Sequence, residues 1–257
     1  NSRISLSNND SGGTGGADGA SGNTLFGNLA GEDIASGGVD NTLIGHGSGK
    51  NITTGDDNIF IGSEVGYNQT TANENVGIGY KSLSTNVTGN KNVAVGTNTL
   101  KTFNIASAGT DTYNVAVGYD AGQAMTTGLY NTFIGGLSGF TLSTASQNTH
   151  IGYKAGYTSN GGGNTSLGYQ ALMDCASGGS NVAIGQVAGE NCTGDNNIFL
   201  GAYAGYNNNE QDNNVYIGSN SALYMDDGGN NVAVGFESMK GASTGNDAAS
   251  NVAIGYH

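Results

Sequence analysis

A five-residue pattern of polar and apolar positions recurs fourteen times along this chain. Each copy begins with asparagine, continues with Thr, Val or Ile, then a variable residue, then Ile, Val, Leu or Phe, and ends with glycine. The asparagines are Asn23, Asn41, Asn58, Asn75, Asn92, Asn114, Asn131, Asn148, Asn164, Asn181, Asn197, Asn214, Asn231 and Asn251. Successive glycines are mostly 16 to 18 residues apart, so each interval marks one structural unit of a repeat protein.

The alternation within the pattern predicts a β-strand. The residues one and three positions after each asparagine are β-branched or apolar, whereas the residue between them varies from Gly77 to His150 and Phe60. Successive side chains of a strand point to opposite faces, so the two outer positions share one face and the middle position lies on the other. We therefore expect a five-residue strand with one buried face, formed by the outer positions. No segment sustains the spacing of three and four residues that a helix needs.

A shorter pattern after each glycine predicts how the chain turns back. A small residue follows most of these glycines at the third position, as Ala121 and Ala155 do, and Gly or a larger apolar residue comes next. Each unit is expected to contain a strand, a tight corner, a short second strand and a return loop. Stacked units of this kind form an all-β parallel β-solenoid of about 14 coils with a period of about 17 residues. The absence of proline agrees, because each rung must donate backbone N–H groups to its neighbour.

The small volume of one coil predicts that several chains associate. Burial contributes ~1.5–3 kcal/mol per Val or Ile side chain, which is offset by ordering costs of ~1–2 kcal/mol per residue. The middle column of the strands combines large residues such as Phe133 and Phe199 with small ones such as Ala94 and Ala183. We expect a partner chain to cover this column in a homo-oligomer.

Several copies of the pattern carry a resemblance to known families. Residues 114–118 (NVAVG), 181–185 (NVAIG) and 251–255 (NVAIG) resemble the head repeat of YadA-like trimeric autotransporter adhesins. The longer form at residues 164–172 resembles the repeated shaft segments of tail fibres from tailed bacteriophages. The likeness covers residues 23–257 and implies a homotrimer of left-handed parallel β-rolls that projects from a virion or cell and serves in attachment.

The phage-fibre likeness is the closer of the two. Adhesin heads usually have shorter repeats and continue into a coiled-coil stalk and a membrane anchor, neither of which occurs in this sequence. The resemblance implies a repeat segment of a virion tail fibre, with a host-surface glycan or receptor and other tail proteins as partners. A bacterial trimeric adhesin or self-assembling extracellular filament at the cell surface is the alternative, and a glycan-cleaving tailspike is the second. The missing initiator Met and the end within a repeat predict processing or truncation.

Residues 1–22 form a separate segment before the β-roll repeat domain of residues 23–257. Residues 3–7 alternate like one strand, and residues 11–22 form a Gly-rich linker without periodicity. Gly12 to Gly15 also permit a calcium-binding turn, although the expected Asp is displaced to Asp18. A flexible segment is the preferred interpretation.

Charge and motif content argue against several classes of function. A formal net charge of −13 and a pI near 4.2 disfavour nucleic acid and anionic membranes as partners. No apolar run is long enough for membrane insertion. His46, His150 and His257 occupy different positions of their repeats, and no zinc spacing, phosphate loop or nucleophile elbow appears. We expect no enzyme, cofactor or metal site.

Tyrosines and one insertion are the candidate ligand contacts. Tyr80, Tyr119, Tyr153 and Tyr169 directly follow the glycine of the repeat, so they fall in one column that suits stacking on sugar rings or on one another. The interval from Gly96 to Gly118 is 22 residues long and includes Phe103 and Tyr113, which we expect at a surface loop that a partner or receptor covers.

The repeat also predicts two structural features. An identical asparagine at one corner of every coil can pass hydrogen bonds from rung to rung, which predicts a buried asparagine ladder. Cys175 and Cys192 each follow their repeat glycine by seven residues, so they should be neighbours on adjacent rungs, ~4.8 Å apart. An extracellular setting favours a disulfide between them, whereas assembly in the cytoplasm favours thiols.

Overall fold

The computed structural model describes residues 22–34, 37–209, 211–225, 228–241 and 249–256, and their regular structure consists of short strands only. The strands are β1 Thr24–Phe26, β2 Thr42–Ile44, β3 Ile59–Ile61, β4 Val76–Ile78, β5 Val93–Val95, β6 Val115–Val117, β7 Thr132–Ile134, β8 Thr149–Ile151, β9 Thr165–Leu167, β10 Val182–Ile184, β11 Ile198–Leu200, β12 Val215–Ile217, β13 Val232–Val234 and β14 Val252–Ile254. The chain forms two compact units, Asn1–Thr127 with β1–β6 and Gly128–His257 with β7–β14. Residues 1–21, which contain the proposed initial strand, most of the linker and the calcium alternative, lie outside the described residues.

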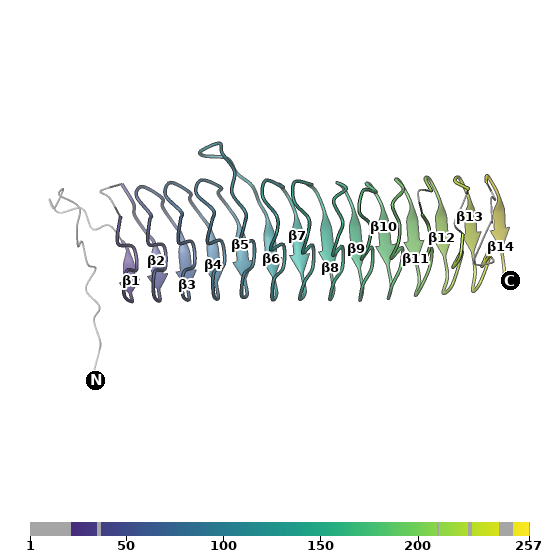
Figure 1. Cartoon of the computed structure of the whole chain (residues 1–257), viewed down its shortest axis with the longest axis horizontal. Coiled ribbons are helices and arrows are strands. Elements are labelled where there is room, and N and C mark those ends of the chain that lie inside the picture. Colours follow the sequence, from purple (N-terminus) through teal and green to yellow (C-terminus); the bar gives the residue numbers. More distant parts are fainter. Residues whose placement is uncertain (1–21, 35–36, 210, 226–227, 242–248, 257) are drawn as a thin grey trace, which may run out of the picture. The chain divides into compact units, whose positions relative to one another are not determined.

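Within each unit every strand pairs in parallel with the next strand of the sequence (Figure 1). The registers are one repeat apart, as in the pairs Val76↔Val93 and Val182↔Ile198. Each unit is therefore a parallel β-solenoid with a period of about 17 residues, which confirms the all-β solenoid predicted from the sequence. The strands have three residues rather than five, and the described residues contain no second strand in the coil. The return path consists of turns and bends instead.

The strand alternation is as predicted, but the buried face is the opposite one. The middle residues lie inside the coil, and Phe60, Phe133 and Phe199 are fully buried within the single chain. The outer residues lie on the outside, where Leu167 and Leu200 are 46% and 42% exposed. The expectation that a partner chain covers the middle column is therefore wrong, because the coil closes around that column.

Two positions share the space inside each coil: the middle residue of the strand and the fourth residue after the repeat glycine. The fourth residue after the repeat glycine faces the middle residue of its own strand, so that a Cβ added at Gly139 would lie 2.6 Å from the Phe133 ring. Gly156 stands in the same relation to His150. A large middle residue is thus accompanied by a residue of minimal size at the fourth position, which is glycine opposite Phe133 and His150 and alanine, Ala222, opposite Tyr216.

A larger residue occupies the fourth position in several coils with a small middle residue. Leu83 accompanies Gly77, and Leu172 accompanies Ser166. Both leucines are fully buried, and they hold positive φ angles of 52° and 50°. Such angles are costly for a side chain with a Cβ, so the leucine must gain enough from burial to offset the strain. This exchange explains why the middle column varies so widely.

The repeat glycine itself is required by close stacking. Gly62 and Gly152 have φ angles of 135° and 136°, and an added Cβ would clash with the carbonyl oxygens of Gly79 and Gly168 on the next rung. No other residue fits a position that needs both this φ and this approach of two backbones. The glycine column therefore fixes the corner at the end of every strand.

The long interval between β5 and β6 is visible as a connection that extends beyond its neighbours (Figure 1). Phe103, however, is fully buried and Ile105 is 6% exposed. The prediction that Phe103 contacts a ligand at a surface loop is wrong, because its ring is buried inside the coil, while the small and polar residues 106–110 form the loop.

Candidate functional site

The asparagine ladder forms the inner corner of each solenoid unit. The repeat asparagines from Asn23 to Asn231 are buried. The backbone N–H of Asn164 donates to Oδ1 of Asn148 (2.9 Å), and the N–H of Asn148 donates in the same way to Asn131 (3.0 Å). The side-chain amide points forward, as in the bond from Nδ2 of Asn164 to the carbonyl of Gly178 (2.7 Å). These side chains serve the fold, not a ligand.

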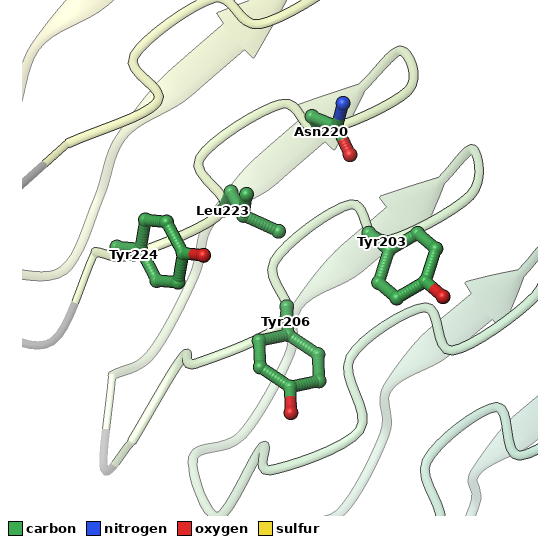
Figure 2. A pocket seen from close by; sticks show the side chains of 5 residues that line it. All are labelled: Tyr203, Tyr206, Asn220, Leu223 and Tyr224. Carbon is green, nitrogen blue, oxygen red and sulfur yellow. The ribbon is translucent and has the colours of Figure 1, made fainter. Parts of the chain in front are cut away.

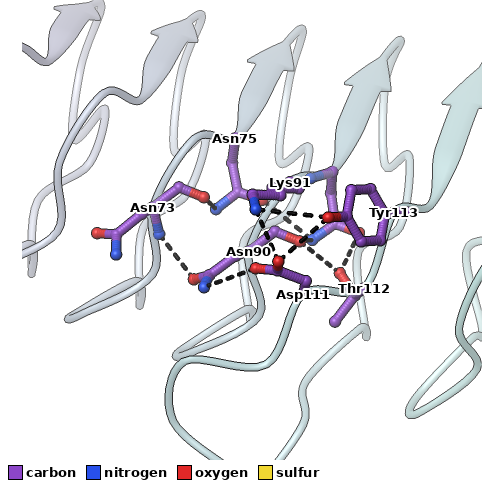
Figure 3. Close-up of polar contacts among 8 residues, drawn as sticks. Asn73, Asn75, Asn90, Lys91, Asp111, Thr112 and Tyr113 are labelled. Atoms are coloured by element: carbon purple, nitrogen blue, oxygen red, sulfur yellow. Dashed lines mark hydrogen bonds and ion pairs between the residues drawn. The ribbon is translucent and has the colours of Figure 1, made fainter.

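A second polar ladder, which the repeat spacing did not predict, runs in the opposite direction along the turns that precede the repeat asparagines. The N–H of Asp56 donates to Oδ1 of Asn73 (2.8 Å). The N–H of Asn73 in turn donates to Oδ1 of Asn90 (2.9 Å) (Figure 3). The same bond joins Gly179 to Asp195 in the second unit (2.7 Å). The signal in the sequence is an Asp, Asn or Ser two residues before many repeat asparagines.

Tyr113 belongs to a polar cluster that holds the insertion in place. Lys91 Nζ lies 2.7 Å from Oδ2 of Asp111, and the Tyr113 hydroxyl donates to the same oxygen at 3.2 Å (Figure 3). The hydrogen bond with Lys91 lowers the pKa of the Asp111 carboxyl, and the same bond raises the pKa of Lys91. Because its hydroxyl is engaged with Asp111, Tyr113 acts as a support for the loop.

Cys175 and Cys192 lie side by side inside the second unit. Both are fully buried thiols, and their side chains contact each other on neighbouring coils. The contact with Cys192, followed by burial, raises the pKa of Cys175. Cys192 also accepts long contacts from the amides of Asn197 (3.6 Å) and Asn208 (3.8 Å). The pair therefore packs in the core as thiols.

The four tyrosines that follow the repeat glycine are exposed. Tyr80, Tyr119, Tyr153 and Tyr169 expose between 45% and 59% of their surface. Tyr153 and Tyr169 stack on each other with ring centroids 5.7 Å apart and planes 20° apart. Lys154 Nζ lies 5.8 Å from the Tyr153 ring centroid, and Lys81 lies 5.0 Å from that of Tyr80. The rings of Tyr80, Tyr153 and Tyr169 thus contact side chains of their own chain, and all four tyrosines remain partly open to solvent.

A further group of aromatic residues surrounds a hollow of about 350 Å³ in the second unit. Its lining residues are Tyr203, Tyr206, Asn220, Leu223 and Tyr224 (Figure 2). The rings of Tyr203 and Tyr206 have centroids 6.1 Å apart and are tilted by 58°. Of these tyrosines, only Tyr206 lies at a repeat position where tyrosine recurs in other coils. The hollow itself depends on which residues neighbouring coils bring together.

The outer face of the strands is the most regular apolar surface of each unit. Every strand contributes two outward side chains, all of them Thr, Val, Ile, Leu or Phe. None carries a charge, and in the internal strands Ile59, Ile134 and Ile198 are 39% to 41% exposed. Exposed apolar surface that continues over several hundred Å² marks an interaction site in soluble proteins. This strand face, defined in each unit by the first and third residues of its strands (β1–β6 in one unit, β7–β14 in the other), is the candidate interface.

The part of the chain that the structure describes contains neither a candidate metal centre nor a membrane-spanning helix. It contains no group of three or more His, Cys, Asp or Glu residues that could hold a metal ion. None of its segments forms a helix of the length and hydropathy needed to span a bilayer. Comparison of the chain with protein-family models, curated proteins and solved structures found no match.

Proposed function

We propose that this chain is a repeat segment of a trimeric attachment fibre, of the kind carried by tailed bacteriophages, in which three left-handed solenoids associate through the strand face. The observation that supports this function is the uncharged, β-branched strand face that each unit leaves exposed along its whole series of strands. A single-chain protein would cover such a face or place charges on it. The sequence resemblance to fibre shafts favours the same function.

The size of the face is adequate for a stable interface. In the second unit, eight strands each present two outward side chains, and those of the internal strands expose up to 46% of their surface. A specific interface buries roughly 800 Å² on each partner, which is of the order of the area these side chains offer. Because each coil presents two uncharged residues at the same spacing, another copy of this chain in register is the partner that matches all of them.

The oligomeric state tests this proposal directly. We expect light scattering after size exclusion to give three times the chain mass. Replacing Ile134 and Ile184 together by Glu places two charges on the strand face and should produce monomers, because each carboxylate must be desolvated at the interface. Ala176→Glu is the matched control, since Ala176 is exposed on a turn of the same unit. A wild-type protein that is monomeric at micromolar concentration would contradict the trimer.

The location distinguishes the fibre from the bacterial adhesin. Antibodies raised against the purified chain should label the tail fibres of phage particles in immunogold electron microscopy. Label on the surface of bacteria that carry no phage would favour an adhesin or extracellular filament instead. Neither outcome depends on the oligomeric state, so the two parts of the proposal are tested separately.

A further inference from the structure

The hollow between Tyr203 and Tyr224 is built by two adjacent coils whose register is fixed. The N–H of Asn220 donates to the carbonyl of Ala202 (2.9 Å), and the N–H of Asn207 donates to that of Leu223 (3.3 Å). One coil therefore supplies Tyr203 and Tyr206, and the next supplies Asn220, Leu223 and Tyr224. Tyr203 and Asn220 also hold positive φ angles of 58° and 57°, so both side chains project from a set corner. The backbone that carries the lining is thus positioned by these hydrogen bonds before any ligand arrives.

The polar groups of the lining are free to bind. Among the residues that the structure describes, the side chains of Tyr203, Tyr206, Asn220 and Tyr224 make no hydrogen bond, and all four are at least partly open to solvent. Tyr113 differs, because its hydroxyl donates to Asp111. Three hydroxyls and one amide are therefore available around the hollow.

The shape and chemistry of the lining match a sugar ring. A pyranose has apolar C–H faces and a rim of hydroxyls, which pair with aromatic faces and with amide or hydroxyl groups. The tilted rings of Tyr203 and Tyr206 form two walls, in contrast to the parallel stack of Tyr153 and Tyr169. Leu223 supplies apolar surface on the next coil (Figure 2). A volume of about 350 Å³ is at the small end of ligand pockets and suits a unit of this size.

The charges near the hollow favour a neutral sugar over an acidic one. Its lining contains no Lys or Arg. Lys240, whose carbonyl accepts the N–H of Tyr224, lies 3.0 Å from the carboxylate of Glu237. With a net charge of −13 on the chain, a carboxylated or sulfated sugar would meet repulsion without a cation to offset it.

From these observations we infer that the hollow lined by Tyr203, Tyr206, Asn220, Leu223 and Tyr224 binds a neutral sugar unit of a glycan. The inference rests on the proposed attachment function and names the ligand class of that function. It places the contact on the side of the solenoid, beyond the repeat glycines of the coils of β11 and β12, and separates it from the strand face.

Saturation-transfer NMR with defined oligosaccharides tests the inference on the full chain. The probes are neutral oligosaccharides of glucose, galactose, mannose and N-acetylglucosamine, together with sialylated and uronic-acid oligosaccharides. We expect at least one neutral oligosaccharide to bind, and Tyr203→Ala and Tyr206→Ala to weaken it roughly tenfold, because each removes a stacking wall. Tyr130→Ala is the matched control: Tyr130 is an exposed tyrosine of the same unit that lies outside the hollow and outside the column of Tyr119, and its loss should change affinity by less than about twofold.

A smaller substitution guards against misfolding. Asn220→Asp keeps the size of the side chain and tolerates the positive φ, but it removes the amide donor, so neutral-sugar binding should fall while the melting temperature is retained. Three results would each overturn the inference: binding unchanged by these variants, binding of acidic sugars alone, or no binding at ~20 mM sugar, well above the ~1 mM dissociation constant of a weak site.

The test also separates this inference from the proposed function. A monomeric chain that binds neutral sugars through these residues would refute the trimer and leave the sugar site intact. A trimeric chain on tail fibres that binds no sugar at this hollow would refute the sugar site alone. The oligomeric state of each variant is measured in the same samples.

Discussion

His150 lies in the interior of the second unit, at the middle of β8, and its burial governs its charge. The ring stacks on Phe133 with centroids 5.8 Å apart, and Nδ1 lies 2.8 Å from Oγ of Ser166. Nε2 has no hydrogen-bond partner among the described residues. Burial lowers the pKa of His150 from 6.5 to about 3, so the folded chain keeps this histidine neutral.

This histidine should make the chain less stable in mild acid. Below pH 6.5 the unfolded chain takes up a proton that the folded chain does not, until the pH approaches 3. The free energy of unfolding should therefore fall by about 1.4 kcal/mol for each pH unit in that window. His150→Phe, which copies Phe133, should remove this contribution. In urea titrations, the gain in stability of the variant over wild type should be about 2 kcal/mol larger at pH 5 than at pH 7.5. An equal gain at both pH values would contradict the shifted pKa.

Loss of one asparagine from the ladder should destabilise the whole unit. Asn148→Ala removes the oxygen that accepts the N–H of Asn164, leaving a buried donor without a partner. We expect a loss of ~1–3 kcal/mol in the free energy of unfolding, measured by urea titration. Asn209→Ala, at an exposed turn position, is the control and should have little effect. If both variants have the same free energy of unfolding as the wild type, the ladder does not stabilise the fold.

At the level of the strand, sequence periodicity predicted where each strand lies, but it did not predict which of its faces is buried. The pattern located all fourteen strands and predicted the asparagine column, because both depend only on spacing along the chain. Alternation shows which side chains share a face, but it does not show which face is enclosed, so Ile134 was expected inside and Phe133 outside. The relation between the middle residue and the fourth position, as in Phe133 with Gly139, contains the missing information. The hollow between Tyr203 and Tyr224 depends on side-chain directions across two coils, and spacing along the sequence does not specify those directions.

Because the middle residue and the fourth position share one space, a substitution at one should restore stability that is lost at the other. Phe133→Ala should lower the free energy of unfolding by ~3–5 kcal/mol because it opens a cavity. Adding Gly139→Leu should restore part of this loss, since the double variant copies the pairing of Ala94 with Leu100 at a φ that Leu100 already adopts. Gly139→Leu alone should be strongly destabilising, because its side chain meets the Phe133 ring. A double variant less stable than Phe133→Ala alone would show that the two positions do not share one space.

Across the whole molecule, charge and apolar surface are separated. The chain has 20 acidic and 7 basic residues, and none of those that the structure describes occupies an outward position of a strand. Charges gather on the turns and loops, as the ion pairs Lys50–Glu32 and Lys81–Glu64 illustrate. Association through the strand face would therefore bring together uncharged surfaces on chains that repel one another overall.

This separation predicts an unusual response of the proposed trimer to salt. Each protomer has a net charge of −13, so added NaCl should weaken the repulsion between protomers while leaving the apolar contacts unchanged. Sulfate should strengthen association further, because it is excluded from protein surfaces and favours apolar burial. In sedimentation experiments at low protein concentration, the fraction of trimer should rise from about 20 mM to 500 mM NaCl, over which the Debye length shrinks to a few ångströms. The Ile134→Glu, Ile184→Glu double variant should remain monomeric throughout the series. Dissociation of the wild-type trimer by NaCl would mean that ion pairs hold the protomers together, and the strand face would then not be the interface.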